Sequence, residues 1–266
     1  RHRSVSRGLG DVYKRQLLTG CGKKEIQKSQ NQVVRRKFKD TDMPLIALGC
    51  MRLPMRNDKI DMVELDKMVE YAMAHGANYF DTAYMYVDGK SENAIGEVLK
   101  KYDRESFILA DKCPAYLVNS PSDVRKLCEE QLKKCQVKYF DNYMVHNINK
   151  NTISNYRDNN MYEELLKLKN EGLIKNIGFS FHGDPAMLRE VIKEHKWDFC
   201  QLQINYLDWE VVNADELYQI ADEAKVPVIV MEPLRGGVLC NLPDKAAQKL
   251  KEECPDDTQA SFGLRW

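Results

Sequence analysis

The sequence lacks an excess of either charge, a paired cysteine motif and a long apolar run. Its 266 residues carry 40 Lys and Arg against 40 Asp and Glu, so its zero formal charge gives no electrostatic reason to expect nucleic acid or an anionic membrane as a partner. No run of about 18 apolar residues occurs, and we expect no transmembrane segment. The eight cysteines are scattered without a C-x-x-C pair, which indicates neither a disulfide framework nor a metal site.

What the sequence does contain is a recurring pair of elements from Leu45 onward. A short apolar run comes first, and a longer stretch with helical spacing follows it. The apolar runs cover residues 45–49, 78–83, 107–112, 142–146, 174–180, 199–204 and 226–232. Their starts lie about 30 residues apart, which is the length of one βα unit, and strands that alternate with helices pair in parallel. The pattern therefore predicts an α/β fold.

Two α/β architectures fit this pattern, an open doubly wound sheet and a (β/α)8 barrel. The first βα turn, at residues 49–54, lacks the G-x-G-x-x-G phosphate loop of a dinucleotide-binding doubly wound fold. We therefore predict an incomplete (β/α)8 TIM barrel in which about seven of the eight βα units are present. Residues 33–38 and 45–48, joined across residues 39–42, are predicted to form an N-terminal β-hairpin that closes the barrel floor.

The N-terminal part of the chain divides into two segments. Residues 1–16 are basic and lack periodicity, which is typical of a non-native leader. Residues 17–32 begin with Leu17-Leu18-Thr19-Gly20-Cys21, which resembles the lipobox of bacterial lipoproteins, and continue as a polar tether. The partial barrel would occupy residues 33–266. A cytoplasmic location, and export or membrane anchoring through a lipid on Cys21, both stay open.

Polar residues end nearly all of the predicted strands. In a (β/α)8 barrel the carboxyl ends of the strands form the active face, and neighbouring strands lie about 4.8 Å apart, so these side chains can meet. In chain order they are Asp81, Lys112, His146, Ser180, Gln203 and Glu232. We also expect Tyr86, five positions after Asp81, to reach the same rim on a short loop.

The combination of Tyr86 with Asp81, Lys112 and His146 predicts carbonyl reduction. A phenol with a pKa of about 10 is a poor acid near neutral pH. An ammonium beside it lowers that pKa, and a carboxylate holds the ammonium in place. An imidazole can hydrogen-bond a carbonyl oxygen on which negative charge develops. No protein side chain donates hydride, so the reductant must be a nicotinamide cofactor.

These residues lie in sequence strings that resemble those of the aldo-keto reductases. Seven strings occur in family order, at residues 49–54, 80–86, 108–112, 141–146, 177–180, 203–206 and 233–237. The resemblance covers residues 33–266 and is strongest to a bacterial subgroup that often carries a C-terminal iron–sulfur segment. It implies an oxidoreductase that reduces an aldehyde or ketone to an alcohol by hydride transfer from NAD(P)H.

The resemblance also implies a role for each site residue. The catalytic tetrad would consist of Asp81, Tyr86, Lys112 and His146. Tyr86 would be the proton donor, and Ser180 and Gln203 would bind the nicotinamide carboxamide. The other cofactor-binding residues would be Gly49, Met51, Asp81, Leu234, Arg235, Gly236 and Gly237. The family implies NADP(H) rather than NAD(H), a small-molecule carbonyl substrate and no metal in this part of the chain.

The resemblance implies further residues beyond Trp266. In the family the pocket for the adenosine 2′-phosphate follows the eighth strand, and a segment binding a 4Fe-4S cluster would come later still. We therefore expect a C-terminally truncated chain: the full-length protein would be active, and the 266-residue fragment would be poorly soluble or weak in cofactor binding. A stable monomer with micromolar affinity for NADPH, measured by titrating the purified 266-residue chain, would contradict this expectation.

Two other functions stay open at this point. A barrel of this family can also serve as a redox-sensing or regulatory subunit that binds NADPH with negligible turnover. A phosphate-binding lyase or epimerase would need a Gly-rich phosphate grip and carboxylate metal ligands, and Asp81 and Glu232 alone do not supply these. The oligomeric state is open as well.

Overall fold

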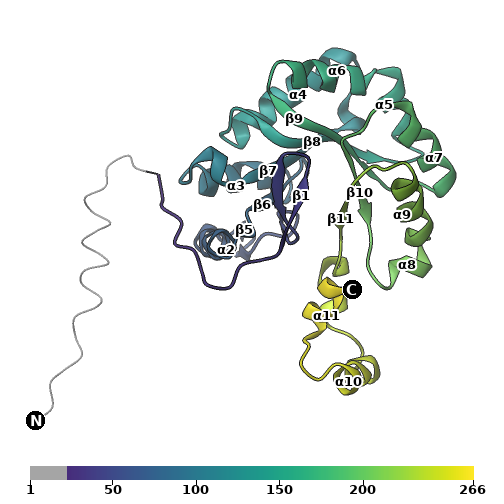
Figure 1. The fold of residues 1–266 in the computed structure, drawn as a ribbon. Coiled ribbons are helices and arrows are strands. Elements are labelled where there is room, and N and C mark those ends of the chain that lie inside the picture. Colours follow the sequence, from purple (N-terminus) through teal and green to yellow (C-terminus); the bar gives the residue numbers. More distant parts are fainter. Residues whose placement is uncertain (1–22) are drawn as a thin grey trace, which may run out of the picture.

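One curled sheet of seven parallel strands forms the centre of the molecule (Figure 1). The computed structural model describes residues 23–266, and the expectations for the leader and for Cys21 lie outside these residues. In spatial order the strands are β11 (Val228–Met231), β10 (Phe199–Gln203), β9 (Ile174–Phe181), β8 (Phe140–Ile148), β7 (Ile108–Pro114), β6 (Tyr79–Asp81) and β3 (Leu48–Gly49). Each strand begins within three residues of the predicted position, and the predicted incomplete (β/α)8 barrel is confirmed.

Helices that connect successive strands cover the outer face of this sheet (Figure 1). They are α2 (Met62–Ala74), α3 (Ser91–Leu99), α4 (Pro121–Lys134), α5 (Ile153–Asp158), α6 (Met161–Asn170), α7 (Pro185–Glu194), α8 (Asp208–Val211) and α9 (Ala214–Glu223). After β11 the chain forms the 3-10 helix η3 (Arg235–Cys240) and then α10 (Asp244–Glu253) and α11 (Gln259–Arg265), which project away from the sheet (Figure 1). Short 3-10 helices also precede and follow β7, η1 (Arg104–Ser106) and η2 (Ala115–Leu117).

Local capping interactions start several of these helices. The Asp184 carboxylate accepts a hydrogen bond of 2.9 Å from the backbone N–H of Met187 at the start of α7. Ser120 and Asp123 form a capping box at the start of α4, where Pro121 occupies the first helical position. Pro lacks an N–H that would be unpaired there anyway, so the chain enters the helix without a lost hydrogen bond.

The buried side chains form two clusters, one on each face of the sheet. The larger cluster fills the space between the strands and the outer helices. The smaller one lies inside the curl and consists of Tyr79, Ile108, Ala110, Met144 and Phe199, with Phe38, Met43 and Ile229 packed against it. Gly178 makes room for the Phe199 ring, because a Cβ at this position would lie 2.5 Å from ring carbons. The seven cysteines of the described residues are free, and five of them are buried.

The N-terminal hairpin closes the floor of the curl, but its predicted register is wrong. Strand β1 (Arg35–Phe38) pairs antiparallel with β2 (Thr41–Pro44), not with residues 45–48. The turn contains only two residues because Lys39 adopts a left-handed backbone with φ 52°. Leu48, predicted to lie in the hairpin, instead begins β3 of the central sheet. The Phe38 ring packs edge-on against Phe199 at 6.3 Å between centroids.

Residues 23–32, expected to be a tether, lie along α2. The backbone N–H of Ser29 donates to the carbonyl oxygen of Ala74 at 2.8 Å, and Lys24 Nζ lies 2.9 Å from Glu70 Oε2. A short antiparallel pair that the sequence did not suggest, β4 (Met55–Arg56) and β5 (Lys59–Ile60), follows β3.

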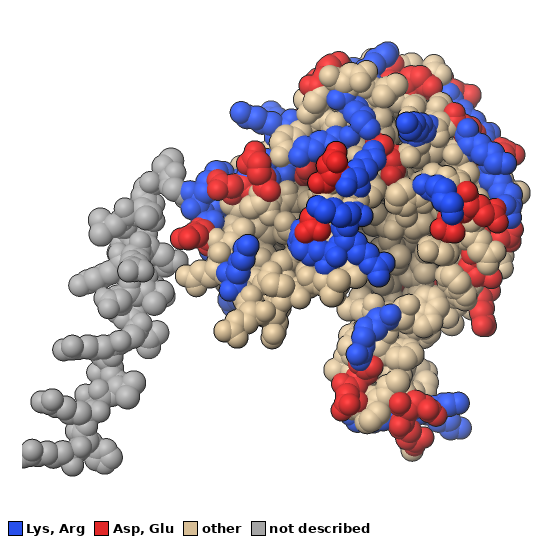
Figure 2. Space-filling model, viewed as in Figure 1, with Lys and Arg blue, Asp and Glu red and all other residues tan. Residues whose placement is uncertain are grey.

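Acidic and basic side chains alternate over the face shown in Figure 2, without a large patch of one sign. This distribution agrees with the zero formal charge of the sequence. Within residues 23–266 we find no helix that is both long and apolar enough to cross a membrane.

The contact between α3 and the end of α4 predicts an unusual effect of a helical Gly. A Cβ on Gly96 would lie 2.6 Å from the carbonyl carbon of Cys135, and backbone atoms cannot move aside as a flexible side chain can. Gly96→Ala should therefore lower the free energy of unfolding by about 1–3 kcal/mol, although Ala favours a helix over Gly by about 1 kcal/mol. Chemical denaturation measures this change. The exposed Lys133→Ala on α4 serves as control, with an expected effect within about 0.5 kcal/mol, and an equally stable Gly96→Ala would contradict the packing.

Candidate active site

Three neighbouring strands bring Asp81, Lys112 and His146 to one end of the sheet. Asp81 is the last residue of β6, and Lys112 and His146 lie near the ends of β7 and β8. Within the parallel register Asp81 pairs with Ala110, and His146 pairs with Pro114. The carboxyl ends of these strands meet at the same rim, as the sequence pattern predicted.

The loop after β6 carries Tyr86 to this rim. A turn closes where the N–H of Tyr86 donates to the carbonyl of Ala83 at 3.1 Å. The buried Ser91 hydroxyl, at the start of α3, lies 3.0 Å from that of Thr82 and donates to the carbonyl oxygen of Cys50 at 2.8 Å. These hydrogen bonds fix both ends of the loop, so the position of the phenol is determined by buried contacts.

Lys112 is a buried cation with a complete set of partners. Its side chain is only 1% exposed, and its ammonium pairs with the Asp81 carboxylate and donates to the carbonyl oxygen of Thr82 at 2.7 Å. Burial disfavours the charged form, but the charges of Asp81 and Tyr86 outweigh it and raise the pKa of Lys112. The amide of Gln201 donates to the other Asp81 oxygen at 2.9 Å. The site therefore holds a hydrogen-bonded ammonium–carboxylate pair.

Tyr86 lies between this ammonium and the imidazole of His146. Lys112 Nζ is 4.7 Å from the centre of the Tyr86 ring, and the Tyr86 and His146 rings meet edge-on at 6.2 Å between centroids. The expected net lowering of the phenol pKa is wrong. Burial raises the pKa of Tyr86, and the Lys112 charge, which lowers it, offsets only part of that effect. Tyr86 therefore stays protonated near neutral pH and can donate its proton.

His146 is neutral in this environment. Burial, together with the smaller effects of the charges of Lys112 and His182, lowers its pKa to about 3. Its Nδ1 is buried and has no hydrogen-bond partner among the described residues. A neutral imidazole has one donor and one acceptor nitrogen, so His146 can hydrogen-bond a polar ligand without adding charge to the site.

The two residues expected to bind a carboxamide lie on the next strands of the rim. Ser180, in β9, accepts a hydrogen bond of 2.7 Å from the backbone N–H of Asn147, which leaves its hydroxyl proton available to donate. Gln203 ends β10 and donates its amide to Asp208 at 2.7 Å. Gln201 and Gln203 are two residues apart in one strand and so share a face, which places Gln203 about 7 Å further toward the rim than the Gln201–Asp81 contact.

The remaining predicted cofactor residues lie at the two edges of the sheet. Gly49, in β3, pairs with Asp81, and Met51 in the following loop is 47% exposed. Beyond β11, Arg235, Gly236 and Gly237 adopt left-handed backbones with φ of 48°, 65° and 95°, after Leu234. This turn exposes backbone instead of side chains, which suits the close approach of a ligand.

Arg52 connects these two edges, although the sequence did not suggest it. Its guanidinium lies 2.8 Å from the Glu232 carboxylate just after β11. The same guanidinium packs on Gly236, where a Cβ would lie 2.8 Å from Arg52 Cζ.

Gln201 and Asp208 also were not singled out from the sequence, although both contact residues of the site. The two-residue spacing between Gln201 and Gln203 could have indicated the former, but no sequence signal distinguishes Asp208 from a solvated loop residue.

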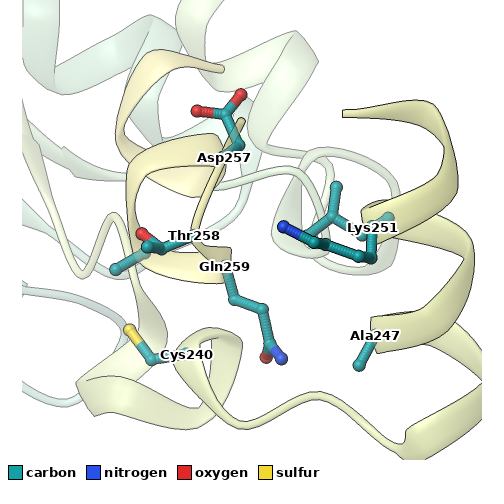
Figure 3. A pocket seen from close by; sticks show the side chains of 8 residues that line it. Cys240, Ala247, Lys251, Asp257, Thr258 and Gln259 are labelled. Atoms are coloured by element: carbon teal, nitrogen blue, oxygen red, sulfur yellow. The ribbon is translucent and has the colours of Figure 1, made fainter. Parts of the chain in front are cut away.

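One cavity lies away from this rim. It has a volume of about 490 Å³ and lies between α10 and α11 (Figure 3). Its lining includes Cys240, Ala247, Lys251, Asp257 and Gln259. None of the predicted site residues lines it, so it is separate from the candidate active site.

Comparison with known proteins gives consistent matches. The sequence model of the Aldo/keto reductase family matches residues 45–262. The chain is 27% identical to the "Probable aldo-keto reductase 1" of Glycine max, across 84% of this chain and 67% of that protein. It is 28% identical to the "NADH-specific methylglyoxal reductase" of Escherichia coli (strain K12), across 70% and 61%. The chain thus spans about two thirds of the length of these curated relatives.

Solved structures show the same fold. The holo form of aldo-keto reductase AKR11C1 from Bacillus halodurans matches with a TM-score of 0.72 and 25% identity, across 88% of this chain and 81% of that one. An aldo-keto reductase from Klebsiella pneumoniae, described as a complex with NADPH, matches with a TM-score of 0.66 and 21% identity, across 88% and 79%. The latter likeness shows the fold alone.

The geometry around His146 predicts its titration. In the wild-type protein His146 should remain neutral from pH 8 down to pH 5, because its pKa lies near 3. Lys112→Met removes the ammonium that disfavours a second positive charge, so the pKa of His146 should rise. Proton NMR of the imidazole resonances, assigned with His146→Asn, measures both values. Lys133→Met removes an exposed lysine and should leave the titration unchanged. A wild-type His146 that titrates near its ordinary value of 6.5 would contradict the observed burial.

Proposed function

The chain belongs to the aldo/keto reductase family, and we propose that it reduces an aldehyde or a ketone to the alcohol with a nicotinamide dinucleotide as the hydride donor. One observation carries the proposal. A protonated phenol, a buried ammonium–carboxylate pair and a neutral imidazole meet at the carboxyl ends of β6, β7 and β8. Carbonyl reduction needs a proton donor and a hydrogen-bond donor around one developing oxyanion, and these groups supply both.

The residues around the tetrad fit a nicotinamide cofactor. Ser180 and Gln203 each keep a hydrogen-bonding group available, and the left-handed turn at Gly236 and Gly237 leaves backbone accessible for a diphosphate. In the proposed assignment Gly49, Met51, Leu234 and Arg235 complete the binding groove. When bound, the dihydronicotinamide supplies the hydride that no side chain can provide.

In the proposed reaction His146 and Tyr86 act on the carbonyl oxygen of the substrate. His146 hydrogen-bonds this oxygen and orients it. As the carbonyl carbon gains a hydride, the C=O π pair becomes an alkoxide lone pair, and the Tyr86 O–H bond breaks to protonate it. The Lys112 ammonium stabilises the phenolate that remains, while Asp81 keeps the ammonium in place. A proton from solvent then restores Tyr86.

The choice of cofactor and substrate is part of the proposal. We expect NADP(H) to be preferred over NAD(H), an expectation that rests on the family resemblance of the sequence. The name of the Escherichia coli relative points to NADH instead, so both cofactors must be compared. The substrate is a small-molecule aldehyde or ketone. The iron–sulfur segment and the lipid anchor on Cys21, considered in the sequence analysis, lie outside residues 23–266.

Tyr86→Phe tests the proposed reaction. Without the phenolic proton, kcat for reduction of an aromatic aldehyde should fall by about 10²–10⁴-fold, the usual contribution of a general acid, while the dissociation constant for NADPH changes little. NADPH oxidation followed by absorbance gives the rate, and quenching of protein fluorescence gives the affinity.

Tyr116→Phe is the matched control. Tyr116 lies in η2, and its ring centroid is 6.5 Å from that of His146, so the control removes a neighbouring phenol by the same chemical change. Its rate should stay near that of the wild type. If the wild type and Tyr86→Phe both bind NADPH but neither turns over aldehyde, the regulatory-subunit reading replaces the enzyme. If the wild type binds no dinucleotide, the proposed function is wrong.

A further inference from the structure

A fully buried carboxylate organises the rim beside Gln203. Asp208, the first residue of α8, is 0% exposed. Its Oδ2 accepts hydrogen bonds from the side-chain amides of Gln203, at 2.7 Å, and Asn205, at 2.6 Å. Its Oδ1 accepts no hydrogen bond from the described residues and lies 3.4 Å from Arg235 Nε. Since burying a carboxylate is costly unless it is well paired, these contacts form a built arrangement.

Asn205 locks this carboxylate in place. Its Oδ1 accepts the backbone N–H groups of Asp208, at 2.9 Å, and Leu207, at 3.1 Å. Its Nδ2 also donates to the backbone carbonyl of Glu232 at 3.0 Å. Because Glu232 directly follows β11, the position of Asp208 is tied to the ends of both β10 and β11.

The Asp208 carboxylate determines the orientation of the Gln203 amide, that is, which of its NH2 and carbonyl ends faces Asp208. The two ends of a glutamine amide are nearly equal in size, but a carboxylate accepts hydrogen bonds and cannot donate them. The NH2 of Gln203 must therefore face Asp208. The carbonyl oxygen Oε1 is then directed elsewhere, and it accepts no hydrogen bond from residues 23–266. One N–H of Gln203 is thus committed to Asp208, and Oε1 is left to accept a hydrogen bond at the rim.

We propose that Asp208 is a positioning residue that holds Gln203 Oε1 toward the cofactor groove, so that the site selects a pyridine ring bearing a carboxamide N–H. This inference rests on the proposed function and concerns the same groove. It assigns to Asp208 a role in cofactor selectivity without direct contact with the reacting atoms. A merely structural Asp208 would affect the binding of all dinucleotides equally.

A pair of cofactors in which a CH3 group replaces the carboxamide NH2 provides the test. NADP+ carries a carboxamide, whereas its 3-acetylpyridine analogue has a methyl ketone and an identical total charge. The wild type should bind NADP+ about five- to tenfold more tightly, which is the contribution of one neutral hydrogen bond. Fluorescence quenching or calorimetry with each probe gives the two dissociation constants.

Asp208→Asn should reduce this preference to about twofold or less. The Asn side chain is nearly isosteric, but it can accept from Gln203 or donate to it, so the glutamine amide is free to flip. Gln203→Met should abolish the preference, and the double variant should show no additional loss. Glu210→Gln makes the same change at an exposed acid of α8 and should retain the wild-type preference.

The outcomes separate this inference from the proposed function. Failure of the wild type to bind either dinucleotide would overturn both. Equal wild-type affinity for both probes, or an Asp208→Asn variant with undiminished preference, would overturn only the role of Asp208. If Asp208→Asn does not fold, hydrogen exchange of the Gln203 side-chain amide in the wild type decides. Slow exchange with and without NADP+ is expected, and fast exchange would contradict a fixed Gln203–Asp208 hydrogen bond.

Discussion

The buried ion pair between Lys112 and Asp81 is the interaction on which the rest of the site depends. An ammonium at 1% exposure is tolerated only because a carboxylate and the Thr82 carbonyl replace its hydration. Removing one partner of such a pair typically costs about 3–5 kcal/mol, because the other charge is left buried and uncompensated. The pair joins β6 to β7, and Gln201 extends the connection to β10.

Burial, together with the charge of Lys112, determines the protonation of its neighbours. Burial raises the pKa of Tyr86 more than the Lys112 charge lowers it, and burial and that charge together keep His146 neutral. The resulting site contains one cation, one carboxylate and two neutral groups that can hydrogen-bond an oxygen. Such fixed dipoles and charges need little rearrangement as a reaction proceeds, which is the physical basis of electrostatic preorganisation.

Asp81 and Asp208 show how a half-buried and a fully buried carboxylate on one rim can serve different purposes. Asp81 faces a full positive charge and holds it in position. Asp208 instead accepts hydrogen bonds from two neutral amides and lies beside Arg235 at a longer distance, so it orders hydrogen-bond donors.

The open side of the curled sheet is bridged near the rim by the Arg52–Glu232 ion pair, while the hairpin covers the floor. The ion pair lies at the mouth of the barrel, and the hairpin closes the opposite end.

The sequence by itself determined the α/β class, the order and approximate bounds of the seven strands, and the placement of Asp81, Lys112 and His146 on successive strand ends. These features follow from apolar periodicity and from the parallel pairing that it requires, which are local properties of the chain. Tertiary structure alone decided the hairpin register, the net direction of the Tyr86 pKa and the role of Asp208. The two-residue turn at Lys39 pairs β1 with residues 41–44, although residues 45–48 are more apolar. A pKa depends on the depth of burial, and a buried Asp has the same local sequence signature as a solvated one. These properties come from packing between segments that are distant in the sequence.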